Sequence, residues 1–194
     1  KWGPVEGIIH GAGVLADKRI ENKTLEDIER VYQTKVKGLQ TLLKVIDESK
    51  LTHLILFSSA AGFFGNAGQS DYAAANEVLN QYAIQFSQNH PDCQVVSFNW
   101  GPWEGGMVTA ELKKMFENRG VFVTPIETGT QIFTDHVLSQ EPKFPLLIVG
   151  SKMGLPEDNF PEPNRKIRIS RSLKLEQLLV LQDHRIGEHV VLPS

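Results

Sequence analysis

The feature that most constrains the fold of this chain is a regular alternation of short apolar runs with longer segments of helical periodicity. The apolar runs are short enough to be buried strands, and they lie at residues 5–10, 53–58, 94–99 and 145–150. The segments between them have helical length and lie at about 24–48, 71–88, 110–118 and 125–139. Strands that alternate with helices favour a parallel sheet covered on both faces. We therefore predict an α/β fold built on a doubly wound parallel sheet.

The loops that leave the predicted strands indicate where a ligand would bind. In open parallel sheets, ligands bind beyond the carboxyl ends of the strands. The loops at 11–17, 59–70 and 100–108 all lie at that edge. We therefore look for site residues in these loops.

Composition excludes several classes of protein. The 194 residues carry a formal net charge of −3, which argues against a nucleic-acid partner. The only cysteine, Cys93, rules out an internal disulfide framework, and the six histidines lack zinc spacing, so no metal site is predicted. No apolar run approaches the roughly 18 residues that span a membrane. With no signal-peptide pattern either, we expect a cytoplasmic protein without a membrane partner.

Composition changes after residue 150. Residues 151–164 contain three prolines and read as a linker. Residues 165–194 begin with a basic, alternating stretch and are too few to form a domain alone. The predicted organisation is a domain over 1–150, a linker over 151–164, and the start of a second domain over 165–194.

Lys35 occupies an unusual place on the first predicted helix. Its spacing puts the ammonium group on an apolar stripe, which is formed by Leu25, Ile28, Val31, Leu39, Leu42 and Ile46. A lysine there either extends to solvent at the edge of the stripe or is a buried cation that lowers the pKa of a neighbour. The sequence leaves both interpretations open.

Three further polar residues complete a possible reaction site. Tyr72 and Asn76 are four residues apart and share a helix face, and Ser59 ends a strand thirteen residues before Tyr72. A lysine cation near the phenol would lower its pKa, so that Tyr72 could donate a proton to a carbonyl oxygen. Ser59 could bond the same oxygen, and Asn76 could hold Lys35 or a water. The alternative is that Tyr72 is an ordinary core residue.

Ordered motifs over about residues 4–150 resemble one known family. The motifs are HGAGVL (10–15), FSSAAG (57–62), GNAGQ (65–69), YAAAN (72–76) and NWGPW (99–103), followed by Gly106 and Met107. They resemble the ketoreductase domain of modular polyketide and polyunsaturated-fatty-acid synthases, within the short-chain dehydrogenase/reductase superfamily. The resemblance implies a Rossmann-like sheet of that type.

The resemblance also implies roles for the four polar residues. Most members of the superfamily outside the synthases have a lysine four residues after the tyrosine. Synthase ketoreductases have asparagine there and take the lysine from the preceding helix, and Asn76 and Lys35 match this arrangement. The implied catalytic set is Tyr72 as proton donor, Ser59 as the carbonyl-binding partner, and Lys35 and Asn76 as supports.

The implied cofactor is NADPH. The implied cofactor-binding residues are Gly11, Ala12, Gly13, Gly101 and Pro102, and the residues implied in substrate binding and stereocontrol are Asp17, Trp103 and Met107. Residues 15–17 resemble a Leu-Asp-Asp motif of the family, and Asp17 is the one aspartate of that motif retained here. No G-x-G-x-x-G fingerprint precedes the first strand, so we expect this chain to lack the N-terminal dinucleotide-binding strands of the fold.

The end of the chain resembles the start of a synthase dehydratase of hot-dog fold. His184 begins the matching segment, and Pro193 follows nine residues later. The resemblance implies His184 as a possible base that removes an α proton. The alternative is a histidine without a catalytic role.

Taken together, these features predict a β-ketoacyl reductase module of a multidomain synthase. Its substrate would be an acyl thioester on the phosphopantetheine arm of an acyl carrier protein, and its partners would include the other synthase domains. Two alternatives stay open: an inactive ketoreductase-like scaffold, and a standalone short-chain reductase of small carbonyl compounds.

Overall fold

The computed structural model describes residues 3–105, 108–139, 144–151, 185–186 and 189–190. The chain divides into two compact units, Lys1–Leu155 and Pro156–Ser194, and each is described by itself. Among the described residues, no helix is long and apolar enough to cross a membrane.

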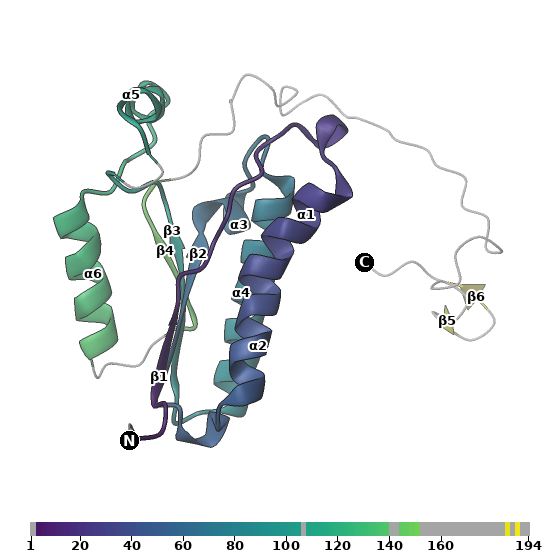
Figure 1. The fold of residues 1–194 in the computed structure, drawn as a ribbon, viewed down its shortest axis with the longest axis vertical. Coiled ribbons are helices and arrows are strands. Elements are labelled where there is room, and N and C mark those ends of the chain that lie inside the picture. The colour runs from purple at the N-terminus through teal and green to yellow at the C-terminus, as the bar shows by residue number, and fades with distance from the viewer. Residues whose placement is uncertain (1–2, 106–107, 140–143, 152–184, 187–188, 191–194) are drawn as a thin grey trace. The chain divides into compact units, whose positions relative to one another are not determined.

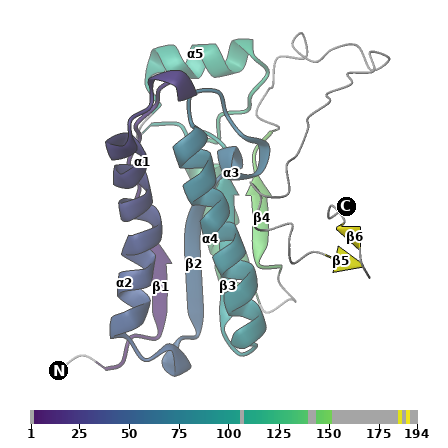
Figure 2. The same ribbon diagram turned by 90° about the vertical axis from the view of Figure 1, so that its right-hand side faces the viewer.

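The first unit is built on a four-stranded parallel sheet, as the alternating pattern predicts. Its strands follow the chain in the order β1 (Gly7–His10), β2 (His53–Ser59), β3 (Gln94–Trp100) and β4 (Leu146–Val149), as Figure 2 shows. β2 is paired along its whole length with β3. All four carboxyl ends therefore lie at one edge of the sheet.

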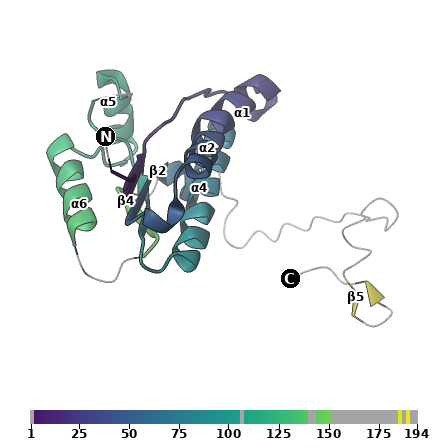
Figure 3. The ribbon, with the colours of Figure 1, turned by 60° about the horizontal axis from the view of Figure 1, so that its bottom comes forward.

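Helices cover both faces of this sheet. On one face lie α1 (Leu25–Tyr32), a π-helical turn (Gln33–Lys37), α2 (Gly38–Val45) and α4 (Ser70–Asn89), and on the other lies α6 (Ile126–Leu138) (Figures 1 and 3). The short α3 (Ala60–Phe64) follows β2 directly, and α5 (Ala110–Asn118) lies beyond the carboxyl edge of the sheet. Two short 3-10 turns complete the set, at Ile20–Asn22 and Glu48–Lys50.

The side chains of β2 alternate between the two faces, as strand geometry requires. Leu54 and Leu56 pack with Leu39 and Leu79 on the side of α2 and α4. Ile55 packs on the opposite side, in a cluster that includes Val96, Phe98, Trp100 and Phe133 of α6. The central strands β2 and β3 are therefore buried between two apolar layers, whereas Ile9 of β1 is exposed on the side of α6.

The first helix begins where its sequence indicates. The Thr24 hydroxyl accepts a hydrogen bond from the Asp27 amide at 3.2 Å, and the Asp27 carboxylate accepts one from the Thr24 amide at 3.0 Å. This reciprocal pair is a capping box, which satisfies two amides that the first turn of a helix leaves unpaired. The start of α1 is thus fixed locally.

The predicted apolar stripe on this helical segment is wrong at three positions. Leu25, Ile28 and Leu42 are exposed, whereas buried residues recur at steps of four, at Asp27, Val31, Lys35, Leu39 and Leu43, with Val36 buried beside Lys35. The π-helical turn within the segment widens the helical repeat there, which suits this four-residue spacing. Lys35 therefore lies on the buried face itself and not at its edge.

In the second unit, the structure describes one antiparallel pairing between β5 (Arg185–Ile186) and β6 (His189–Val190). His184 and residues 152–164 of the predicted linker lie outside the described residues. Their assignment to a dehydratase-like domain stays a prediction.

Candidate active site

A cavity of about 770 Å³ opens at the carboxyl edge of the sheet. Its walls come from the loops after β1, β2 and β3, from the first turn of α4, and from α5. The predicted site residues that line it are Gly11, Gly13, Asp17, Lys35, Ser59, Tyr72, Gly101, Pro102 and Trp103. The sheet edge therefore gathers most of the residues that the motifs single out.

Lys35 is a buried cation, which decides between the two interpretations of its sequence position. It is 3% exposed, and its ammonium group donates a hydrogen bond to the Phe57 carbonyl at 3.0 Å. The Lys35 Nζ also lies 5.4 Å from the centroid of the Tyr72 ring. Burial lowers the pKa of Lys35 to about 8, because the charged form loses hydration.

Tyr72 is partly buried at the start of α4, and its electrostatics differ from the prediction. Burial raises the pKa of the phenol, the side chains of Asn76 and Ser59 oppose this rise, and the negative charge of Asp17 adds to it. The net shift of this pKa is therefore upward and not downward as predicted, because desolvation dominates. The phenol stays protonated at neutral pH, as a proton donor must.

The two adjacent serines at the end of β2 have different partners. The Ser59 hydroxyl accepts a hydrogen bond from the Ala61 amide at 3.2 Å and so caps α3. Ser58 is buried and donates to the Asn76 carbonyl at 3.1 Å and to Asn99 Oδ1 at 3.2 Å. Because Ser58 is committed to this buried network, Ser59 is the serine available to a ligand.

Asn76 is fully buried in α4 behind Tyr72. Its side-chain amide donates to the Tyr72 carbonyl at 2.8 Å, and its Oδ1 has no hydrogen-bond partner among the described groups. The predicted direct contact with Lys35 is not formed, because the ammonium group bonds to Phe57 instead. A buried amide oxygen without a partner is unfavourable by about 1–3 kcal/mol. The Asn76 Oδ1 can therefore accept a hydrogen bond from a further donor.

A buried polar network, which the sequence did not single out, fixes α4 against β3. Asn80 donates to Asn99 Oδ1 at 2.9 Å and accepts from the Ser97 hydroxyl at 2.8 Å. The position of Asn80 four residues after Asn76 is a signal that could have indicated it. Through Ser58 the network also reaches the carbonyl of Asn76, so it ties the two strands to the helix that carries Tyr72.

Hydrogen bonds hold the loop after β1 close to α4. The Asp17 carboxylate accepts from Gln69 Nε2 at 2.8 Å, and the Lys18 amide donates to the Gly68 carbonyl at 3.0 Å. A second link joins Lys23 to Asp71 at 2.7 Å, and both side chains are almost completely buried. These contacts bring Asp17 within electrostatic reach of the phenol.

Glycines keep the floor of the cavity open. A Cβ on Gly13 would lie 3.4 Å from Lys35 Cε, and one on Gly101 would lie 3.3 Å from the Val149 carbonyl oxygen. Gly11 and Pro102 also line the cavity, whereas Ala12 is exposed and is not among the lining residues. These small residues leave room for the flat nicotinamide end of the implied cofactor, whereas the predicted cofactor residue Ala12 lies outside the cavity lining.

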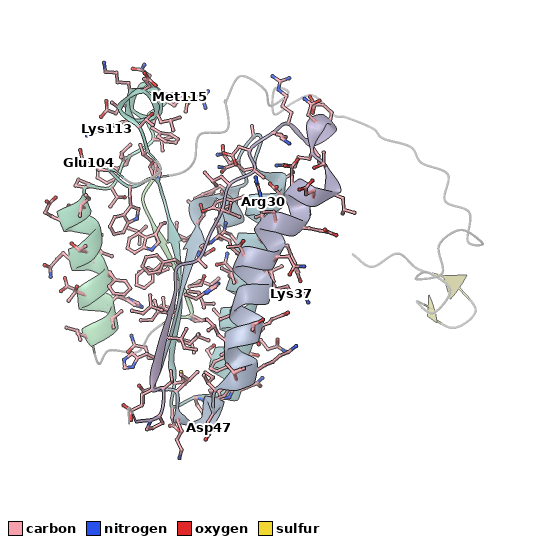
Figure 4. All side chains as sticks on the ribbon, in the orientation of Figure 1. Arg30, Lys37, Asp47, Glu104, Lys113 and Met115 are labelled. Atoms are coloured by element: carbon pink, nitrogen blue, oxygen red, sulfur yellow. The ribbon has the colours of Figure 1, made fainter. Side chains whose placement is uncertain are left out.

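The outer wall of the cavity comes from α5, which the sequence did not assign to the site. Leu112, Met115, Phe116 and Arg119 line this wall. Glu104, in the loop after β3, pairs with Lys113 at 2.5 Å, and Figure 4 shows both beside Met115 on the α5 end of the molecule.

Trp103 packs edge-on against Trp100 with ring centroids 4.7 Å apart. Met107 lies outside the described residues.

Sequence comparison relates the chain to synthase proteins. Residues 1–105 match the KR domain family. The chain is 41% identical over 196 residues to a polyunsaturated fatty acid synthase protein of Thraustochytrium sp. (strain ATCC 26185 / S-3), an alignment that covers 98% of this chain and 6% of that protein. It is 39% identical over 140 residues to polyketide synthase PksN of Bacillus subtilis (strain 168), an alignment that covers 68% of this chain and 2% of that protein. The chain thus spans only a small part of these relatives.

Comparison of structures gives the same relation. A ketoreductase from the first module of phoslactomycin biosynthesis in Streptomyces sp. HK803 matches with a TM-score of 0.68 and 30% identity, over 76% of this chain and 33% of that one. A ketoreductase domain from the bacillaene assembly line matches with a TM-score of 0.65 and 36% identity, over 77% of this chain and 37% of that one. The Rossmann-like parallel sheet predicted from the sequence is therefore confirmed.

Proposed function

Because this chain belongs to the KR domain family, we propose that it carries the catalytic residues of a β-ketoacyl reductase. The proposed reaction reduces the β-ketone of an acyl thioester to an alcohol with NADPH. The observation that carries this proposal is the meeting of Lys35, Ser59 and Tyr72, from three separate elements, at one cavity, with Asn76 directly behind them.

In the proposed mechanism, Tyr72 donates a proton to the carbonyl oxygen of the substrate. Its raised pKa keeps the phenol protonated until that oxygen gains negative charge. The Ser59 hydroxyl donates a hydrogen bond to the same oxygen and stabilises the developing charge. After the proton has moved, the Lys35 ammonium, already close to the ring, stabilises the phenolate.

The residues at the floor of the cavity fit the cofactor. Gly11, Gly13, Gly101 and Pro102 would hold its nicotinamide end, since they leave this surface free of bulky side chains. When bound, NADPH supplies the hydride that reduces the carbonyl carbon. The apolar wall formed by α5 would exclude water from the reacting atoms.

The relatives support a place for this chain within a larger synthase. Their names describe polyunsaturated fatty acid and polyketide synthases, so the proposed partners are other domains of the same protein and an acyl carrier protein that presents the thioester. The first alignment covers 98% of the chain and so continues into the segment after residue 150. A dehydratase-like identity for that segment, with His184 as base, belongs to the same proposal.

The proposal is tested by measuring NADPH consumption with a β-ketoacyl thioester, using the synthase module that contains this chain. Tyr72→Phe is expected to reduce turnover by about 10²–10⁴-fold, because the proton donor is lost. Tyr82→Phe is the matched control, since Tyr82 lies on the same helix and packs against the apolar core. Equal turnover in the two variants would contradict the assignment of Tyr72. No turnover in any form, despite cofactor binding, would favour an inactive scaffold.

A further inference from the structure

The backbone of the π-helical turn is held by a residue to which no role has been given. His10 is the last residue of β1, and its Nε2 lies 2.8 Å from the Lys35 carbonyl oxygen. A carbonyl oxygen only accepts hydrogen bonds, so the His10 Nε2 carries the proton and donates it. The contact joins residues 25 positions apart and is buried.

The surroundings of His10 favour a neutral, fixed imidazole. The residue is 3% exposed, and Gly38 packs so closely that a Cβ there would lie 3.5 Å from the His10 Cε1. Burial lowers the pKa of His10, its hydrogen bond to the Lys35 carbonyl opposes this, and the Lys35 charge adds to the lowering. His10 is therefore a neutral donor at ordinary pH.

Lys35 is consequently held at both ends by neighbouring strands. Its carbonyl accepts from His10 at the end of β1, and its ammonium group donates to Phe57 near the end of β2. Around Lys35 the backbone follows a π-helical path, a rare conformation that is found frequently at functional sites. Since β1 and β2 are paired directly, the distance between the two anchors is set by the sheet.

We propose that His10 is a positioning residue that holds the π-helical turn so that the Lys35 ammonium lies beside the Tyr72 ring. The inference rests on the proposed function, because it assigns His10 a part in the same reaction. Without the imidazole donor, the turn would relax and the ammonium group would shift from Tyr72. Gln is the conservative replacement, since its side-chain amide can also donate to the carbonyl.

The first test does not depend on catalysis. The pKa of Lys35 is measured by NMR in protein carrying [¹³Cε]lysine, with its signal identified by its loss in Lys35→Arg. In His10→Leu the pKa of Lys35 is expected to rise from its low value toward that of an exposed lysine, and in His10→Gln it is expected to stay low. Val96→Ala, a destabilising change in the core on the opposite face of the sheet, serves as the control and should leave this pKa unchanged. An unchanged pKa in His10→Leu would overturn the proposal.

The second test uses ketone reduction by the synthase module. His10→Leu is expected to lower kcat by about ten- to a hundredfold with little change in KM, because small misplacements of a reacting group are costly. His10→Gln should restore most of kcat, and His53→Leu, the same change at the opposite end of the sheet, should retain it. If His10→Leu moves the pKa of Lys35 and leaves kcat intact, the role in the reaction is overturned. If the unmodified module shows no reduction, the proposed function fails, and the NMR result alone decides whether His10 positions Lys35.

Discussion

Replacing Lys35 with methionine is predicted to stabilise the fold at neutral pH. Methionine keeps the unbranched length of the side chain and removes the buried charge. A pKa of about 8, against the ordinary 10.5, corresponds to about 3 kcal/mol of unfavourable burial of the ammonium group. Loss of the hydrogen bond to the Phe57 carbonyl offsets about 1 kcal/mol of this. The variant should therefore be about 2 kcal/mol more stable at pH 7.

The pH dependence of this difference gives the sharper test. Because the pKa of Lys35 is lower in the folded state, the unfolded state binds more protons between about pH 8 and 10.5. The cost of burying Lys35 is fully present below pH 8 and fades as the pH rises through this window. The advantage of Lys35→Met should therefore shrink with increasing pH and disappear at its upper end.

The assay is urea unfolding of the wild type and the variant at about pH 7 and about pH 10. Lys37→Met is the matched control, since Lys37 belongs to the same turn and is exposed. Its effect should stay within about 0.5 kcal/mol at both pH values. A Lys35→Met variant that is less stable than the wild type at pH 7, or whose stability advantage does not change with pH, would contradict an unfavourable burial of the Lys35 charge. The same variant should lose ketone reduction, which would show that the lysine is kept for chemistry at a cost in stability.

Two further variants test the walls of the site. Lys23→Met should lower the free energy of unfolding by about 3–5 kcal/mol, because it leaves the Asp71 carboxylate buried without its partner. The measurement is urea unfolding, and a loss below about 1 kcal/mol would contradict a buried ion pair between Lys23 and Asp71. Gly129→Ala should displace the Trp103 indole, since its Cβ would lie 2.4 Å from a ring carbon, and so change tryptophan fluorescence and cost about 1–3 kcal/mol. Gly3→Ala, which meets nothing within 4 Å, is the control, and identical spectra for the two alanine variants would argue against the contact.

The sheet and most of the site were predictable because their signals are local. The apolar runs mark the strands, and a parallel sheet brings every loop that follows a strand to the same edge, so Ser59 and Gly101 had to be neighbours of the cavity. Tyr72 and Asn76 followed from helical spacing. The start of α1 at Leu25 agrees with the helical segment predicted from about residue 24.

What the sequence did not reveal depends on contacts between distant segments. The π-helical turn changes which residues after it face the sheet, and it accepts a hydrogen bond from His10 on another element. The pKa of Tyr72 depends on the balance between burial and its neighbours, which spacing alone does not give. The contribution of α5 to the cavity depends on the path of the loop after β3 and not on any pattern within the helix.

We propose that this chain directs hydride from NADPH to a β-ketone, with Tyr72 supplying the proton. The most direct measurement follows deuterium from NADPH labelled at the transferring position of its nicotinamide, using the synthase module and a β-ketoacyl thioester. Mass spectrometry of the product is predicted to find one deuterium on the β carbon of the hydroxyacyl chain, and the yield is predicted to collapse in Tyr72→Phe. Hydroxyacyl product without deuterium at that carbon, or undiminished labelling in Tyr72→Phe, would contradict the account.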